Sequence, residues 1–414
     1  NLPPPPFCYL SLMLRRLGPI VLLAALALAA YIMLADYLNL RAVPEDSAPA
    51  RPATLPMPQP WGGYAWRELA RNAGDTWRQD PALSTDTLRA AAVRYPIDAV
   101  QWLDRARIEA VAGADDAVDR LLSVAGAVQP YERRSLWAAT QVALQAGNPR
   151  LAERQLRQWL LDYPQDTERA LFVGRRWVDS PGDLIDRVLP EGRDYLDAAL
   201  RVARRQRDPD LADAAWARIQ PSPGHESAAF LDYIETLLDA GRIDEARQKW
   251  AAVDPAAGQG GIVNGRFDRG FGEGLGLNWR TERAPAGVRI QRDTADYTSA
   301  PASLRIDFGG QDNIHLAVPW TRIPVEPGAR LVLTGQWRAA GLTTRSRPYL
   351  QLTAEGARIN ARVEVPGADF DWQPFELDVD VPEESQLLRL TVRRNRTNAF
   401  DRNIAGTLWL DDLT

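Results

Sequence analysis

The spacing of apolar residues changes near residue 260, and this change most constrains the fold. Before it, apolar residues recur at helical spacing, as in the stripe formed by Leu151, Leu156 and Trp159. After the Gly- and Ala-rich segment at 255–260, apolar and polar residues alternate with a period of two. A helical stripe and a strand face need different packing partners, so the sequence predicts a multidomain chain. An all-α part is expected first, followed by an all-β part with its own core.

Residues 17–35, LGPIVLLAALALAAYIMLA, contain no charged residue. As a helix rising about 1.5 Å per residue, they would be roughly 28 Å long, close to the ~30 Å hydrocarbon core of a bilayer. Arg15 and Arg16 precede them. The positive-inside rule therefore predicts a single-pass anchor in a bacterial inner membrane, with the N-terminus cytoplasmic and the bulk periplasmic. The alternative is a signal peptide cut after Ala27-Leu28-Ala29, which would leave only about ten apolar residues before the cut.

The two segments that flank the apolar stretch have different expected roles. Residues 1–16 are expected to be a cytoplasmic segment, or to begin ahead of the true start, because Met13 directly precedes Leu14-Arg15-Arg16. Residues 36–63 carry a series of prolines from Pro44 to Pro60. That composition predicts an extended, solvated linker between the membrane and the rest of the chain.

Turn signals recur with a fixed period in the helical region, residues 64–255. Gly113 and Gly147 follow similar helical segments, and 147 − 113 = 34. Arg207 aligns with Gly241 in the same way, and 241 − 207 = 34. Glycine or asparagine at such turns is expected to adopt the left-handed conformation that caps a helix.

A 34-residue helix-turn-helix period is that of tetratricopeptide repeats. The Tyr-Pro pairs at 95–96 and 163–164 lie 163 − 95 = 68 residues apart, which is twice that period. The region thus resembles a divergent tetratricopeptide array of about five helix pairs, with a shortened unit near 179–192. This resemblance implies a superhelical solenoid that binds a protein partner.

The last part, residues 260–414, predicts an antiparallel β-sandwich or jelly roll. Phe375 and Val379 point to its core, while Glu376 and Asp378 between them face water. The expected strands are 288–293, 303–308, 314–320, 330–337, 349–356, 358–365, 375–381, 387–394 and 407–412.

Three segments of this part carry a family resemblance. It opens with Asn264-Gly265-Arg266-Phe267-Asp268 before Trp279, continues with Val325-Glu326-Pro327-Gly328, and closes with Leu408-Trp409-Leu410-Asp411-Asp412. These segments resemble carbohydrate-binding modules of the galactose-binding-like jelly-roll type. The resemblance implies a sugar site on a sheet face or on the loops at one end. It also implies a structural calcium ion, for which the carboxylates of Asp268, Asp307, Asp411 and Asp412 are candidates. The alternative is that these acids cap turns.

Strand alternation predicts a set of outward-facing groups suited to a glycan. Amides and arginines suit sugar hydroxyls and carboxylates, and an aromatic ring suits the apolar face of a sugar. The candidate glycan-binding residues are His315, Gln336, Arg338, Tyr349, Gln351, Arg393 and Asn395. The alternative is an ordinary solvated sheet face.

Composition excludes several chemistries. Lys249 is the only lysine, Cys8 the only cysteine, and His225 and His315 the only histidines. These counts exclude a lysine-ended phosphate loop, a cysteine-based zinc cage and a three-histidine metal site. The net charge, 49 − 54 = −5, argues against nucleic acid as a partner. No nucleophile elbow or recognisable pair of catalytic carboxylates is present, so a non-catalytic protein without an organic cofactor is expected.

These parts together suggest a periplasmic scaffold for synthesis or export of an envelope polysaccharide, by analogy with the architecture. Two alternatives remain. One is a structural assembly factor that binds no sugar, and the other is an enzyme whose carboxylates come from both domains. An open Tyr349 flanked by arginines would favour a ligand, whereas burial of that face on the helices would favour assembly.

Overall fold

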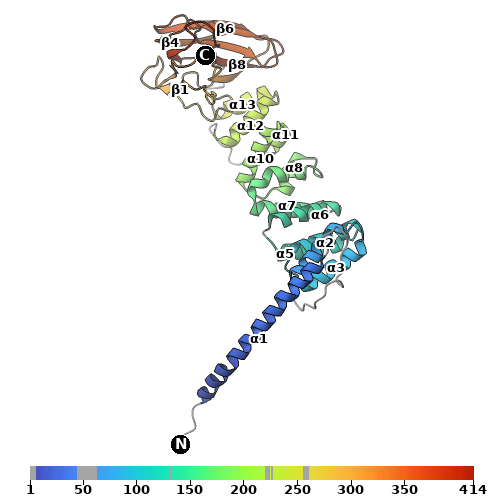
Figure 1. The fold of residues 1–414 in the computed structure, drawn as a ribbon. Coiled ribbons are helices and arrows are strands. Elements are labelled where there is room, and N and C mark those ends of the chain that lie inside the picture. Colours follow the sequence, from blue (N-terminus) through green and yellow to red (C-terminus); the bar gives the residue numbers. More distant parts are fainter. Residues whose placement is uncertain (1–5, 44–62, 131, 220–223, 225–226, 255–260) are drawn as a thin grey trace. The chain divides into compact units, whose positions relative to one another are not determined.

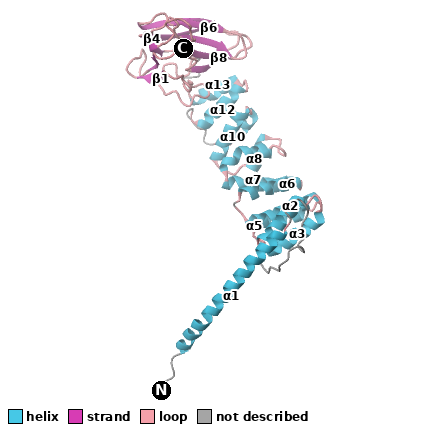
Figure 2. Cartoon of the chain, in the orientation of Figure 1, coloured by secondary structure: helices cyan, strands magenta, loops and turns pink. Residues whose placement is uncertain are grey.

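The computed structural model describes residues 6–43, 63–130, 132–219, 224, 227–254 and 261–414. It divides the chain into two compact units, Asn1–Glu191 and Gly192–Thr414. Helices make up the described part of the first unit and the beginning of the second, and strands follow (Figure 1 and Figure 2). The division into a helical region and a β-sandwich is therefore confirmed. The last four helices, however, group with the sandwich, and the unit boundary precedes the expected domain boundary at 255–260.

The apolar helix α1 (Pro6–Ala42) continues beyond the expected anchor. Its stretch Ile20–Ala42 is long and apolar enough to cross a membrane, a property that signal sequences share. Residues 36–42 were expected in the linker but are helical, because the end of α1 packs on α2 (Tyr64–Thr76). The other expected linker residues, 44–62, lie outside the described residues, as do residues 1–5.

The helices after α1 pack in consecutive pairs. In the first unit they are α2, α3 (Pro81–Arg94), α4 (Ala99–Val111), α5 (Asp115–Val128), α6 (Arg133–Gln145), α7 (Pro149–Asp162), the 3₁₀ helix η2 (Pro164–Asp166), α8 (Thr167–Gly174) and α9 (Pro181–Val188). In the second unit they are α10 (Arg193–Gln206), α11 (Pro209–Trp216), α12 (Ala228–Asp239) and α13 (Ile243–Val253).

Helix spacing follows the expected period over part of the chain. The starts of α4, α6 and α8 are separated by 133 − 99 = 34 and 167 − 133 = 34 residues. The short pair α8 and α9 then brings the next start after only 193 − 167 = 26 residues. This short pair coincides with the expected shortened unit. The described residues hold six such pairs, against about five expected from the sequence.

The predicted capping turns are confirmed. Gly113, Gly147 and Gly241 have φ angles of 74°, 68° and 76°. Arg207, which aligns with Gly241, also has a positive φ of 54°. After each of these residues a backbone N–H donates to the carbonyl five positions earlier, at 2.9 to 3.0 Å. That bond satisfies a carbonyl that the end of a helix would otherwise leave unpaired.

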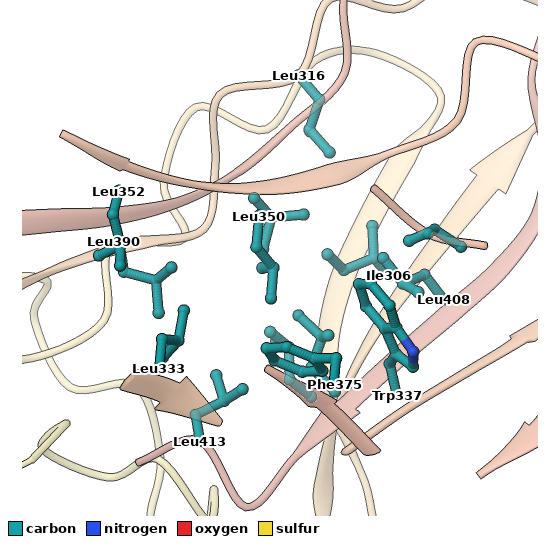
Figure 3. Close-up of a cluster of buried hydrophobic side chains, with 14 of the residues drawn as sticks. Ile306, Leu316, Leu333, Trp337, Leu350, Leu352, Phe375, Leu390, Leu408 and Leu413 are labelled. Atoms are coloured by element: carbon teal, nitrogen blue, oxygen red, sulfur yellow. The ribbon is translucent and has the colours of Figure 1, made fainter. Parts of the chain in front are cut away.

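The sandwich consists of two antiparallel sheets. Its strands are β1 (Val288–Asp293), β2 (Ser303–Gly309), β3 (Trp320–Pro324), β4 (Arg330–Ala340), β5 (Tyr349–Ala354), β6 (Asn360–Glu364), β7 (Phe370–Asp380), β8 (Leu387–Arg393) and β9 (Ala405–Asp411). One sheet has the order β1-β2-β9-β4-β7 and the other β3-β8-β5-β6. Their inner faces bury apolar side chains such as Trp337, Phe375, Leu350 and Leu390 (Figure 3).

The predicted position of one strand, 314–320, was wrong. Residues 314–319 form no strand, and Leu316 makes only an isolated bridge to Arg394. Strand β3 begins at Trp320 and runs through a segment that was not expected to be a strand. Pro319 lacks the N–H that a strand residue donates to its neighbour, which explains why regular pairing starts after it.

Within the second unit, α12 is joined to the sandwich by buried charges. Glu235 Oε2 accepts a hydrogen bond from Arg280 Nη2 at 2.7 Å, and Glu235 Oε1 accepts from Arg322 Nη1 at 3.0 Å. Trp320 lies between two guanidinium groups, those of Arg280 and Arg389, each 4.2 Å from its ring. These contacts explain why the last helices and the sandwich form one compact unit.

Candidate functional site

The outer face of the four-stranded sheet gathers polar side chains that alternate with the core. In β8, Leu388, Leu390 and Val392 are buried in the core, so the residues between them point outward. Directly paired residues of antiparallel strands share a face, and Arg393 pairs with Tyr349. We call the outward set Tyr349, Gln351, Asn360, Arg362 and Arg393 the arginine face.

The structure places five of the seven candidate glycan-binding residues on this side. Tyr349, Gln351 and Arg393 belong to the arginine face by strand register. His315 and Asn395 are exposed and flank the bridge between Leu316 and Arg394, which extends the pairing beyond β8. These five residues therefore lie along one continuous surface.

The other two candidates do not join them. Gln336 and Arg338 lie on β4, which belongs to the five-stranded sheet. The seven candidates therefore do not share one sheet face. The reason is that β4 and β5, although consecutive in sequence, belong to different sheets. Alternation distinguishes inner from outer residues but does not tell which sheet a strand joins.

A chain of hydrogen bonds orders the arginine face. Arg393 Nη1 donates to Gln351 Oε1 at 2.8 Å, and Gln351 Nε2 donates to Asn360 Oδ1 at 2.5 Å. Gln351 is only 8% exposed. Among the described residues, the buried Nε of Arg393 has no hydrogen-bond partner. A buried donor without a partner costs free energy, which a hydrogen bond to an acceptor would recover.

Tyr349 is not the open aromatic platform that its position suggested. It is 7% exposed, and the guanidinium of Arg362 lies 5.7 Å from its ring centre. Arg362 also forms an ion pair with Glu364 at 3.4 Å. The accessible groups of this face are thus Arg362, Arg393 and Asn360, because Gln351 is as buried as Tyr349. Asn360 and Arg362 were not among the predicted glycan-binding residues. The alternation of the expected strand 358–365 nevertheless places both on one face of the sheet.

The β3 side of the same sheet is closed by α12. The guanidinium of Arg322 contacts Glu235 at 3.0 Å, Asp239 at 2.8 Å and Glu355 at 3.3 Å. Burial by itself would lower the pKa of Arg322, but these three carboxylates raise it above the usual value. All of the ion pairs of Arg322 are thus with carboxylates at the contact between α12 and the sandwich, which we call the joint. The open part of the face lies over β5, β6 and β8.

Arg338 has a structural role on the opposite sheet. Its guanidinium pairs with Asp296 and with Asp371, the latter at 3.5 Å, and it lies 4.9 Å from the ring of Trp409. Trp409 Nε1 donates to Asp293 Oδ2 at 2.9 Å. These partners hold Arg338 against its own sheet rather than leaving it free for a ligand.

Three of the four candidate calcium ligands already accept hydrogen bonds from neighbouring protein groups. Asp411 Oδ2 accepts from the backbone N–H groups of Thr298 and Ser299, each at 2.7 Å, so it caps a turn. Asp307 lies farther along the sheet. Its carboxylate accepts a hydrogen bond at 2.8 Å from Thr407, which precedes Asp411 on β9 by 411 − 407 = 4 residues.

The remaining two acids do not complete a site. Asp412 accepts from the hydroxyls of Thr298 and Ser299, and Asp268 is exposed. Within the described residues no three acidic, histidine or cysteine side chains converge. The turn-capping alternative fits Asp411 and Asp412.

No protein-family model and no curated protein matches the chain. Solved structures do match. Among them, each over 37% of this chain, are the enzymatically active domain of tailspike protein 4 from bacteriophage CBA120 (12% identity, 21% of its length, TM-score 0.27), a CBM4 structure (19%, 97%, 0.27) and TmCBM61 in complex with β-1,4-galactotriose (13%, 95%, 0.26). The chain thus spans about a fifth of the tailspike structure. With TM-scores below 0.5, these likenesses identify neither a family nor a ligand.

Proposed function

We propose that the chain is a non-catalytic, membrane-anchored scaffold whose sandwich binds an anionic polysaccharide through the arginine face. In this proposal α1 spans a bacterial inner membrane, with the N-terminus cytoplasmic and the rest periplasmic. The helices form a superhelical array like that of tetratricopeptide repeats and bind a protein partner. The assembly acts in synthesis or export of an envelope polysaccharide.

The ordered arrangement of Arg393, Gln351 and Asn360 supports this proposal most strongly. Their hydrogen-bond chain holds the guanidinium of Arg393 in one place before a ligand arrives, which lowers the entropy cost of binding. A buried guanidinium Nε without a partner among the described residues suits a carboxylate, which accepts two parallel hydrogen bonds from arginine.

The ring of Tyr349 is covered, so the open aromatic side chain that would favour a glycan ligand is missing, and support for a ligand comes from the charged groups alone. Neutral glycans depend largely on stacking of a sugar ring against an open aromatic side chain. Here Arg362 occupies the space over the ring, so the face offers positive charge in place of a platform. A polymer of uronic acids matches these groups better than a neutral glucan.

The array and anchor roles rest on separate observations. The 34-residue spacing of α4, α6 and α8, together with the repeated left-handed turns, supports the tetratricopeptide resemblance. The apolar stretch within α1 supports the anchor.

Titration of the full chain in nanodiscs with a polyuronate and with a neutral glucan, followed by calorimetry, tests the glycan proposal. We expect saturable binding of the polyuronate and weaker or no binding of the glucan. Arg393→Ala should weaken binding at least tenfold, about 1.4 kcal/mol, because it removes a charge-assisted hydrogen bond. Arg338→Ala is the matched control, since it removes an arginine from the opposite sheet and should leave affinity unchanged.

Either of two results would overturn glycan binding. One is no binding of either polymer, and the other is equal loss of affinity in Arg393→Ala and Arg338→Ala. Binding that weakens steadily with salt and equally for any arginine would indicate only nonspecific charge attraction, which also contradicts a site at the arginine face.

A structural assembly factor is the second candidate, and the buried joint favours it. Arg322 and Trp320 belong to the same outer sheet face, and their end of it is occupied by protein. A face used throughout for packing would leave Arg393 substitutions without any effect on polysaccharide binding. The calorimetric comparison therefore distinguishes the two candidates.

A further inference from the structure

The end of α1 is attached directly to the first helix pair. Asp36 Oδ1 accepts a hydrogen bond from the backbone N–H of Ala65 at 3.1 Å, at the start of α2. Ala35 and Asn39, one helical turn apart, are fully buried. The uncharged stretch 17–35 thus ends where α2 begins. If α1 spans a bilayer, the first turn of α2 lies at the level of its surface.

Two contacts show which other segments lie at this level. The guanidinium of Arg94, at the end of α3, lies 4.7 Å from the ring of Trp66 in the first turn of α2. Arg67 Nε pairs with Asp98 Oδ2 at 3.1 Å, which brings the turn between α3 and α4 to the same place. The start of α2, the end of α3 and the start of α4 therefore meet beside α1.

This meeting point exposes large apolar side chains. Val93 is 79% exposed, Ile97 is 64% exposed and Tyr64 is 62% exposed. We call Tyr64, Val93 and Ile97 the membrane-proximal patch. Exposure of apolar side chains to water is unfavourable. Single exposed apolar residues are common, but three grouped at one helix junction indicate a surface that contacts another apolar phase.

The chemistry of the patch matches the boundary between lipid headgroups and acyl chains. Tyrosine is enriched at that boundary, and arginine extends its apolar stem along lipid while its charge stays in the headgroup layer. Arg67 and Arg94 lie directly beside the patch. Of the nearby carboxylates, Asp36 and Asp98 already accept hydrogen bonds from protein, and Glu68 forms an ion pair with Arg71 at 3.6 Å.

We infer that the membrane-proximal patch lies in the bilayer interface, so that the first helix pair contacts the membrane surface as well as being tied to α1. Lipid is the occupant because α1 brings the patch to the bilayer, whereas a protein partner would have to compete with the membrane for it. The inference rests on the proposal that α1 spans a membrane. Residues 36–42 of the expected linker would then belong to a helical region fixed against the lipid.

Fluorescence of a polarity-sensitive label in the full chain tests the inference. The variants Ile97→Cys and Phe172→Cys, made in a Cys8→Ser background, are labelled with nitrobenzoxadiazole and placed in nanodiscs with or without nitroxide lipids. Phe172 is the matched control, because it is 61% exposed and lies on α8, which packs on α7 and α9. Leu26→Cys, in the apolar stretch of α1, reports whether α1 is inserted.

We expect blue-shifted emission and strong nitroxide quenching at positions 26 and 97, and neither at position 172. Quenching at 26 without quenching at 97 would overturn the membrane-proximal patch while leaving the anchor intact. No quenching at 26 would overturn the anchor and the patch together. Equal quenching at 97 and 172 would also contradict the patch, because contact with lipid would then not be confined to the first helices.

Discussion

Glu235 on α12 and Arg322 on β3 form an ion pair across 3.0 Å in which both side chains are largely buried. Arg280 shares the same carboxylate at 2.7 Å, and the backbone N–H of Gly276 donates to it at 2.7 Å. Buried charges are costly unless they are paired. Glu235 is the carboxylate that both arginines share, and Asp239 and Glu355 pair with Arg322 as well. This arrangement makes the last helices and the sandwich depend on each other.

Loss of this carboxylate should therefore destabilise the whole second unit. Glu235→Ala leaves Arg280 and Arg322 buried near each other, and we expect a loss of about 3 to 5 kcal/mol in the free energy of unfolding. Urea denaturation, followed by far-UV circular dichroism and tryptophan fluorescence, measures this loss. The exposed pair of Arg247 and Glu326 supplies the control, since Glu326→Ala should cost less than about 1 kcal/mol. Similar effects of the two substitutions would contradict a buried joint.

The stability of the first unit should depend on the protonation of Asp104. Burial raises the pKa of this carboxyl to about 6, although Arg107 partly opposes the rise. Because the folded pKa lies above the unfolded value, the stabilising contribution is complete below about pH 4 and is lost as pH rises through 6. We expect the free energy of unfolding to fall by up to roughly 3 kcal/mol between these limits. Asp104→Asn should flatten this dependence, whereas Asp86→Asn, which removes an exposed acid, should not.

Calcium should have no effect on the sandwich, whereas removal of Asp411 should have a large one. The carboxylate of Asp411 accepts hydrogen bonds from two backbone N–H groups and from the Thr298 hydroxyl at 2.9 Å. Asp411→Ala leaves these donors without that acceptor, and we expect a loss of about 3 kcal/mol. Thermal denaturation with added calcium and with a chelator is the measurement. A calcium-dependent rise in the melting temperature of the unsubstituted protein would show that a metal is held after all.

The turn at Arg207 offers a stabilising substitution. Its φ of 54° is unfavourable for a residue with a Cβ and favourable for glycine, so Arg207→Gly should raise the free energy of unfolding by roughly 1 kcal/mol. Gly241→Ala makes the opposite exchange at the equivalent turn and should lower it by a similar amount. Chemical denaturation of the two variants checks both signs. Destabilisation by Arg207→Gly would mean that the arginine side chain contributes more than its backbone costs.

Local features of the fold were predictable because each depends on a few neighbouring residues. The helix-capping turns at Gly147 and Gly241 and the alternation in β8 follow from glycine chemistry and strand geometry. The pairing of Glu235 with Arg322 was not predictable, since these residues are 322 − 235 = 87 positions apart. Each is only one charged residue among many, and no local pattern marks the other as its partner.

The candidate site shows the same limit. Alternation predicted that Gln351 and Arg393 lie on the outer side of their strands, as the strand register shows. The hydrogen bond between them is visible only in the structure. Alternation could not show that Arg338 belongs to the opposite sheet, because sheet membership depends on long-range pairing. Nor could it show that Arg362, on the neighbouring strand, covers the ring of Tyr349.

The joint at Glu235 also bears on how this chain can exchange parts in evolution. The change in composition at 255–260 suggests a natural place for recombination between genes. A sandwich transferred at that point would leave without Glu235, so Arg280 would lose the carboxylate it pairs with, and Arg322 would keep only Glu355 of its three. Inheritance of a working sandwich therefore requires that α12 travel with it, so the heritable module begins before Ala228.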